Sequence, residues 1–124
     1  MNAPKIIAQL KSRYPRKTIV KNNEESPTEI ICEIVPTVKD SKRSVAIAII
    51  DRSEPHFHKN ATERYEVTKG QLILSIDAVE YILHEGDKKT IRPGSVHFAT
   101  GKETWVKTTS TPGWTPDDHI KTKI

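Results

Sequence analysis

The chain has 124 residues, a formal net charge of +4 and a hydrophobic content of 35%. This length suits one domain and is too short for two well-buried cores. The longest apolar run, residues 45–50, is far shorter than the roughly 20 residues of a transmembrane helix, so we expect no membrane span. Isoleucine and valine together number 23 against four leucines, and such β-branched side chains favour strands. The composition therefore predicts a β-rich protein.

Several common classes of protein are excluded by the absence of their motifs. Cys32 is the only cysteine, so neither an internal disulfide nor a cysteine pair for zinc can form. The sequence has no GxxxxGKS or GxxxxGKT phosphate-binding loop and no GxSxG nucleophile motif. The first residues also lack the apolar stretch of a secretory signal, and we expect a cytoplasmic protein.

The positive charge is concentrated at the start of the chain. Residues 1–22 contain six basic side chains and no acidic one, and the remainder has a net charge of −2. Such a segment occurs in nucleic-acid-binding arms, membrane-surface helices and transit peptides, but also in solvated helices packed on a domain. We favour the last interpretation and expect neither nucleic-acid nor membrane binding.

The first predicted element is a short helix. Asn2 can cap it, Pro4 is tolerated in its first turn, and Pro15 ends it. At helical spacing the apolar residues then share one face. That face consists of Ile6, Ile7, Leu10 and Tyr14.

Short β-type runs follow, separated by turn residues such as Lys69-Gly70 and Pro93-Gly94. Closely spaced strands of this kind are typical of hairpins that close into a sandwich or barrel. After them, Trp114 is expected to pack an irregular C-terminal tail. The predicted strands are residues 28–35, 43–51, 64–68, 71–76, 79–83 and 103–108.

Four residues have the pattern of a metal site. His56 and His58 are two apart beside a strand, so both rings point to the same side. Glu63 follows a short loop, and His97 arrives from a later strand. Three imidazoles and one carboxylate suit one divalent ion of Fe, Mn, Ni, Co, Cu or Zn and leave positions open for a ligand. His84 and His119 have no such partners in the sequence.

Over residues 43–109 the chain resembles the cupin superfamily. The first cupin motif, which contains HxH, a glutamate and a glycine, is matched by His56, His58, Glu63 and Gly70. The second motif is matched by Gly86, Gly94 and His97. Three motif positions differ, and none of them is a metal ligand in the family. They are Ile50 for a glycine, Arg92 for a proline and Gly101 for an asparagine.

This resemblance implies an all-β fold of cupin type, a double-stranded β-helix or jelly-roll barrel of two antiparallel sheets with a short N-terminal helix or arm. Residues 1–27 are then the helix or arm, 28–110 the barrel and 111–124 a tail packed on it. The sequence looks most similar to the single-domain cupins grouped near mannose-6-phosphate isomerase. Because cupins commonly dimerise, the resemblance also implies a homodimer.

Other residues are candidates for contact with a substrate. Alternation along the strand after Glu63 points Tyr65 into the barrel, where it either donates a hydrogen bond to a ligand or fills space. Trp105 either lines the pocket or packs between sheets. Three basic residues at strand ends either hold an anionic group or are simply solvated. They are Arg43, Lys69 and Arg92.

Two functions remain open at this stage. The first is a metal-dependent enzyme that isomerises or oxidises a small oxygen-chelating substrate such as a sugar, a sugar phosphate or a hydroxy or keto acid. The second is a barrel that binds or senses a small ligand without turnover. An open four-ligand site favours the enzyme, because structural metals usually have closed coordination. The spacing identifies no general base, so the catalytic residues stay unassigned.

Overall fold

The computed structural model describes residues 1–123. This part of the chain contains one α-helix, ten strands and one 3-10 helix, and none of its helices is long and apolar enough to cross a membrane. In chain order the elements are α1 (Ala3–Arg13), β1 (Thr18–Lys21), β2 (Glu29–Val35), β3 (Ser44–Arg52), β4 (His56–Phe57), β5 (Thr62–Lys69), β6 (Leu72–Ile76), β7 (Val79–Leu83), β8 (Lys88–Ile91), β9 (His97–Thr111), η1 (Pro116–Asp118) and β10 (Ile120–Lys121).

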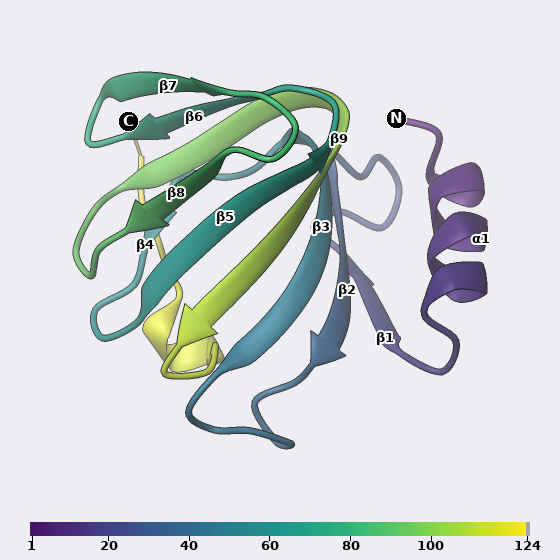
Figure 1. The fold of residues 1–124 in the computed structure, drawn as a ribbon, viewed down its shortest axis with the longest axis horizontal. Coiled ribbons are helices and arrows are strands. Elements are labelled where there is room, and N and C mark those ends of the chain that lie inside the picture. The colour runs from purple at the N-terminus through teal and green to yellow at the C-terminus, as the bar shows by residue number, and fades with distance from the viewer. Residues whose placement is uncertain (124) are drawn as a thin grey trace.

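The strands form a curled antiparallel barrel whose two walls share β9 (Figure 1). In the first wall, the part of β9 from Thr104 onward lies between β3 and β5. β3 pairs in turn with β2 and β2 with β1, whereas β5 pairs with β8. In the second wall, the part from His97 to Gly101 pairs with β4 and β6, which pair with β10 and β7. The predicted all-β antiparallel barrel is confirmed, although its two walls belong to one continuous ten-stranded sheet rather than to two separate sheets.

A bend in β9 lets this strand pass from one wall to the other. Glu103 lies in the bend with a φ of 47°, a left-handed conformation that is uncommon for a residue other than glycine. A Cβ atom on Gly101 would collide with the side chain of Thr104 and would lie 3.1 Å from the carbonyl oxygen of Ile50. This close approach leaves no room for a side chain at position 101, so glycine fits there better than a larger residue.

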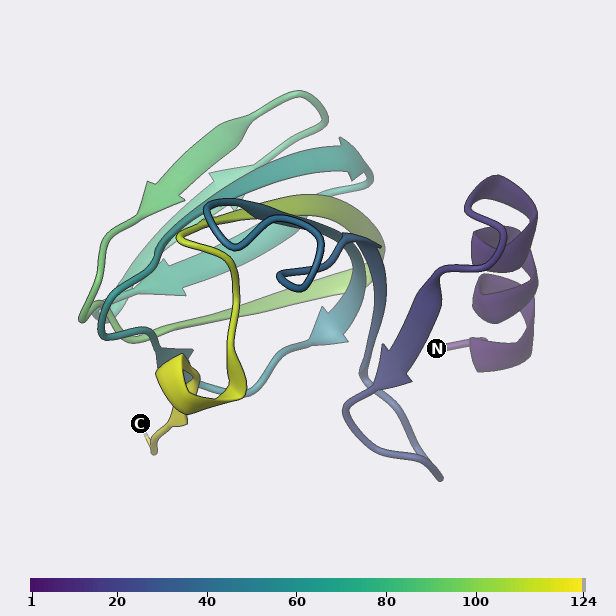
Figure 2. The same cartoon turned by 90° about the horizontal axis from the view of Figure 1, so that it is seen from below.

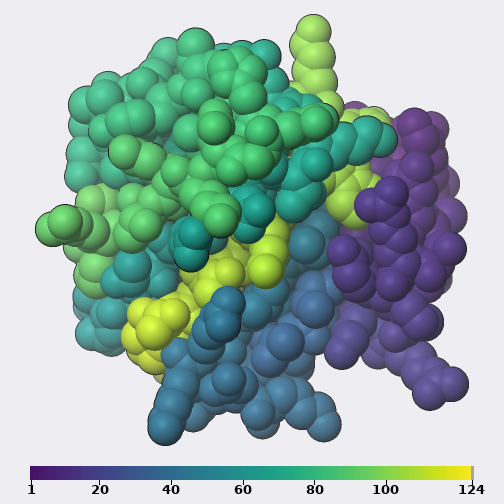
Figure 3. Space-filling view, viewed as in Figure 1, coloured from purple at the N-terminus to yellow at the C-terminus, as the bar shows by residue number. Residues whose placement is uncertain are grey.

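Two apolar cores occupy opposite faces of the first wall. The inner core fills part of the barrel and includes Ala48, Ile50 and Val67. The outer core lies between this wall and α1, which packs on the outside of the barrel (Figures 1 and 3). Its buried members are Ile6, Leu10, Ile30, Cys32, Ile47, Ile49 and Trp105. The helix therefore covers a sheet face that would otherwise be exposed apolar surface.

Helix α1 agrees with its prediction from the sequence. The Oδ1 atom of Asn2 accepts a hydrogen bond from the Lys5 N–H at 3.2 Å, and Ile6 and Leu10 are almost completely buried. The six predicted strands are also present, but β1, β4, β8, β10 and the first part of β9 are additional. These segments are short or polar, so their pairing with longer neighbours determines their conformation.

Replacing Leu10 with alanine tests whether the outer core stabilises the fold. The side chain has no exposed surface, so Leu10→Ala should lower the free energy of unfolding by about 3 kcal/mol through lost burial and a cavity. Denaturant unfolding followed by circular dichroism measures this change. Lys11→Ala, at an exposed position of the same helix, is the control, and equal stability of the two variants would contradict the packing described.

Candidate metal centre

Three neighbouring segments bring the four predicted ligand residues together. His56 begins β4 and pairs with His97 at the start of β9, whereas Glu63 lies near the start of β5. His58 is two residues after His56, so the two rings point to the same side of the chain. All four residues are buried, with exposed fractions of 7% or less.

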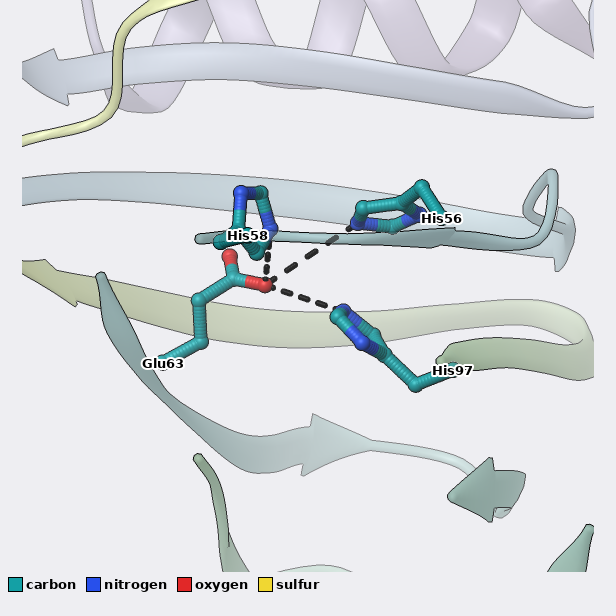
Figure 4. Close-up of side chains that lie close together, drawn as sticks. All are labelled: His56, His58, Glu63 and His97. Carbon is teal, nitrogen blue, oxygen red and sulfur yellow. Dashed lines mark hydrogen bonds and ion pairs between the residues drawn. The ribbon is translucent and has the colours of Figure 1, made fainter. Parts of the chain in front are cut away.

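The potential ligand atoms converge around one carboxylate oxygen (Figure 4). Glu63 Oε1 lies 2.7 Å from His58 Nε2, 3.0 Å from His97 Nε2 and 4.0 Å from His56 Nε2. All four ligand atoms are within 4.8 Å of one another. Ligands about 2.1 Å from one ion are about 3 Å apart at right angles and about 4.2 Å apart when opposite. The distances of 2.7–4.0 Å from Glu63 Oε1 are close to these values and suit a single shared ion.

The second ring nitrogen of each histidine is held by the backbone. A carbonyl oxygen lies 2.8 Å from Nδ1 of His56, 3.0 Å from Nδ1 of His58 and 2.9 Å from Nδ1 of His97. The carbonyl groups belong to Glu54, Asp118 and Ser95, respectively. Because a carbonyl oxygen only accepts, each Nδ1 carries a proton, and in a neutral ring the Nε2 lone pair is free to bind a metal.

The contact between His58 and Glu63 supports a cation at this position. Their Nε2 and Oε1 atoms are 2.7 Å apart, yet His58 Nε2 is buried and has no partner in hydrogen-bond geometry among residues 1–123. A nitrogen lone pair facing a carboxylate oxygen is repulsive unless positive charge lies between them. A divalent metal supplies that charge, and this nitrogen and oxygen donor set suits Fe, Mn, Ni, Co, Cu or Zn. The four residues therefore fit a metal ion.

The protonation states of the site also suit metal binding. Burial lowers the pKa of His56 to about 3, so this ring is neutral at neutral pH. Burial raises the pKa of Glu63, but contacts with His58 and His97 outweigh it and keep this carboxyl ionised. Burial lowers the pKa of His58, but the Glu63 carboxylate outweighs that effect and the net shift is upward. Without a metal, His58 and Glu63 therefore hold a proton where a metal would bind.

The C-terminal tail, drawn in yellow in Figure 2, pairs through β10 with β4 and fixes the loop after His58. Asp118 is buried, and its Oδ1 atom accepts hydrogen bonds from the N–H groups of Lys59 and Asn60, each at 2.9 Å. Its Oδ2 atom accepts from the Ala61 N–H at 3.0 Å, and its carbonyl oxygen accepts from His58 Nδ1. One residue of the tail thus sets both the loop backbone and the orientation of a ligand ring.

His119, the next residue of the tail, stacks on a ligand ring. Its ring centroid lies 4.2 Å from that of His56, with 14° between the planes, and its Nδ1 accepts a hydrogen bond from Trp114 Nε1 at 3.2 Å. Burial lowers the pKa of His119, which favours the neutral ring in this position. The tail therefore forms part of the site.

A cavity of about 460 Å³ adjoins the cluster, a volume suited to a small molecule. It is lined by the inner face of β2, β3, β5 and β9 and by the tail, and His56, His58 and Glu63 form part of its wall. Tyr65 also lines it, with its ring centroid 6.0 Å from that of His97. Burial raises the pKa of Tyr65 well above its usual value, so its phenol stays protonated and can donate a hydrogen bond.

Glu29 is a second carboxyl group in this cavity, and the sequence pattern did not identify it. It projects from β2, and its carboxylate forms no hydrogen bond or ion pair within residues 1–123, although its backbone N–H donates to Asn22. Burial, with repulsion from Glu63 and Glu54, raises the pKa of Glu29 to about 7. A carboxyl group that titrates near neutral pH suits acid–base catalysis.

The remaining candidates lie outside the cavity. Trp105 is part of the outer core, where the guanidinium of Arg13 lies 4.9 Å from its ring centroid. Alternation along β9 turns it away from the face that lines the cavity, so the structure shows packing rather than a pocket wall. Arg43, Lys69 and Arg92 are exposed, and none of them lines the cavity.

No protein-family model matches the sequence, and no curated protein matches it. Solved structures do match. Pac13 of Streptomyces, described as a unique nucleoside dehydratase, is 14% identical with a TM-score of 0.77, over 90% of this chain and 88% of its own. A cupin-like protein from Thermotoga maritima is 19% identical with a TM-score of 0.64, over 74% of this chain and 76% of its own.

FeII HppE is 11% identical with a TM-score of 0.67, over 77% of this chain and 56% of its own. At these identities the likeness concerns the fold. The chain therefore has the cupin-like fold that its motifs implied.

Replacing Asp118 tests the role of the tail in the site. Asp118→Ala removes the acceptor of three loop N–H groups, so it should weaken Zn²⁺ binding about 10- to 100-fold, as expected when a residue that orients a metal ligand is lost. Calorimetric titration of the folded variant measures the affinity. The neighbouring exposed residue provides the control Asp117→Ala, and equal affinities of the two variants would contradict this role.

The raised pKa of Glu29 predicts a pH-dependent stability. The folded protein holds this proton from the usual value of 4.5 up to about 7, so its stability should fall as pH rises through that window. Between about pH 5 and pH 8, with a chelator present, the wild type should lose about 2 kcal/mol relative to Glu29→Gln. Urea unfolding at several pH values measures this difference, and parallel pH profiles of the two proteins would contradict the shift.

Proposed function

We propose that this chain is a metal-dependent enzyme that acts on a small polar substrate through its oxygen atoms. The observation that carries the proposal is the convergence of three imidazole nitrogens and one carboxylate oxygen beside a cavity. Structural metal sites are usually closed by their protein ligands. Four ligands leave two positions on an octahedral ion, which is typical of sites that bind substrate.

The residues of the site have three different roles in this proposal. His56, His58, Glu63 and His97 hold the metal, which when bound polarises substrate oxygens or, if it is iron, supports oxidation. Tyr65 donates a hydrogen bond to a substrate oxygen. Glu29 accepts a proton from the substrate and returns it, because it is a cavity carboxyl without a protein partner and its pKa lies near neutral pH.

A proton carrier in the cavity favours reactions that move a proton. Isomerisation and elimination both remove a proton from a carbon atom near a polarised oxygen. Pac13, which has the same fold, is described as a nucleoside dehydratase, and this description supports the elimination. Oxidation is the second candidate reaction; it needs a redox-active metal, and FeII HppE, which has a similar fold, is described with ferrous iron.

The alternative is a barrel that binds or senses a ligand without turnover, which the lack of a general base in the sequence pattern favours. Glu29, a carboxyl group in the cavity with a pKa near 7, weakens that alternative. Four points stay predictions from the sequence. They are the cytoplasmic location, the homodimer, the similarity to the group near mannose-6-phosphate isomerase, and the division of the chain into arm, barrel and tail at residues 27 and 110.

Metal content tests the first part of this proposal. Protein purified without a histidine tag or chelator should contain near one equivalent of a transition metal, and His58→Ala should contain less than about a tenth of that, because a ligand is lost. Elemental mass spectrometry measures the content. His84→Ala removes an exposed histidine whose side chain is 70% accessible and should keep the metal, so loss in both variants or in neither would contradict the assignment.

Turnover tests the second part with the same proteins. Metal-loaded wild type is incubated with a panel of sugars, hydroxy ketones and nucleosides, and products are followed by mass spectrometry. The product should be absent with His58→Ala, reduced at least about 100-fold with Glu29→Gln, and unchanged with His84→Ala. Tight binding without any product would instead support a binding barrel.

A further inference from the structure

Acidic side chains line the cavity, and no lysine or arginine of residues 1–123 lies among them. Three glutamates, Glu29, Glu33 and Glu63, belong to its wall. The chain as a whole has 20 basic residues and a net charge of +4. The acidic cavity is therefore a local arrangement that opposes the overall charge of the protein.

Two of these glutamates are not neutralised by protein groups. Glu63 contacts the imidazoles of the cluster, but the carboxylates of Glu29 and Glu33 form no hydrogen bond or ion pair within residues 1–123. They lie four residues apart on β2 with Ile31 between them, so all three share the inner face of the strand. The negative charge of these carboxyl groups therefore acts on whatever enters the cavity, and Glu29, with a pKa of about 7, carries it fully only above neutral pH.

Exposed apolar side chains also form part of the cavity wall. They are Val20, Val38 and Trp114, with exposed fractions of 43%, 91% and 39%. These are half of the six large apolar side chains that the structure shows as exposed. Exposed apolar side chains gathered around a cavity are typical of a surface that contacts a ligand.

We infer that the cavity selects a neutral or positively charged ligand with an apolar end, and that it rejects phosphates and other anionic groups placed away from the metal. This inference rests on the proposed function, since the metal orients the oxygen end of the ligand. Buried phosphate and carboxylate groups need cationic or N–H partners, and the wall offers carboxylates instead. The inference removes sugar phosphates from the substrate classes considered above.

A matched series of three probes tests this charge selection. Hydroxytyrosol, dopamine and dihydrocaffeate share a catechol with two adjacent oxygens and a flat apolar ring. Their side chains end in a hydroxyl, an ammonium and a carboxylate group, respectively. The protein is loaded with Zn²⁺, which has no redox chemistry, and binding is measured by isothermal titration calorimetry.

Wild-type protein should bind dihydrocaffeate about tenfold more weakly than hydroxytyrosol, and dopamine at least as tightly as hydroxytyrosol, because the wall carboxylates repel a carboxylate and attract an ammonium group. Glu33→Lys places a positive charge in the wall and should reverse the order of dopamine and dihydrocaffeate. Glu25→Lys changes the net charge equally at an exposed position that does not line the cavity and should leave the wild-type order unchanged.

The outcomes separate this inference from the proposed function. If Zn²⁺ binds but dihydrocaffeate is bound as tightly as hydroxytyrosol, or if Glu25→Lys reverses the order as Glu33→Lys does, the charge selection is overturned and the metal site stands. If Zn²⁺ does not bind at all, the proposed function fails and this inference fails with it. Reversal by Glu33→Lys alone supports both.

Discussion

A buried carboxylate surrounded by imidazoles is the constraint on which the rest of the structure depends. Glu63 is 7% exposed and has three histidine nitrogens within 4.0 Å of one oxygen. Removing a carboxylate from water is costly unless positive charge compensates it. The histidine Nδ1 atoms donate to backbone carbonyls, so the Nε2 atoms contribute lone pairs and the compensating charge must be a proton or a metal ion.

The scaffold around this carboxylate is assembled from distant parts of the chain. β9 supplies His97 to one wall and then bends at Gly101 to pair with β5, which carries Glu63. The tail closes the arrangement, since Asp118 holds the loop after His58. The same barrel positions the four metal-binding residues and encloses the acidic cavity beside them. The metal site and the selection of a small molecule therefore depend on the same strands.

Local patterns predicted the helix, the main strands and the four clustered residues. Strand alternation and motif spacing were enough to identify the cluster, because His56, His58 and Glu63 lie within one short segment and His97 belongs to the second motif. The roles of Asp118, His119 and Glu29 depend on contacts over long sequence distances, which no local pattern encodes. In β2, the residues that face α1 are more buried than those that face the cavity. The sequence pattern of this strand therefore makes Glu29 and Glu33 look like ordinary solvent-exposed residues.

The central claim is that three imidazoles and one carboxylate share one metal ion, and anomalous X-ray diffraction from a crystal of the native protein tests it most directly. Data collected on both sides of the absorption edge of the metal found in solution identify the element and its position. The account predicts a single peak within bonding distance, about 2.0–2.2 Å, of the Nε2 atoms of His56, His58 and His97 and of Glu63 Oε1. A peak elsewhere, or metal-loaded protein without a peak among these four residues, would contradict it.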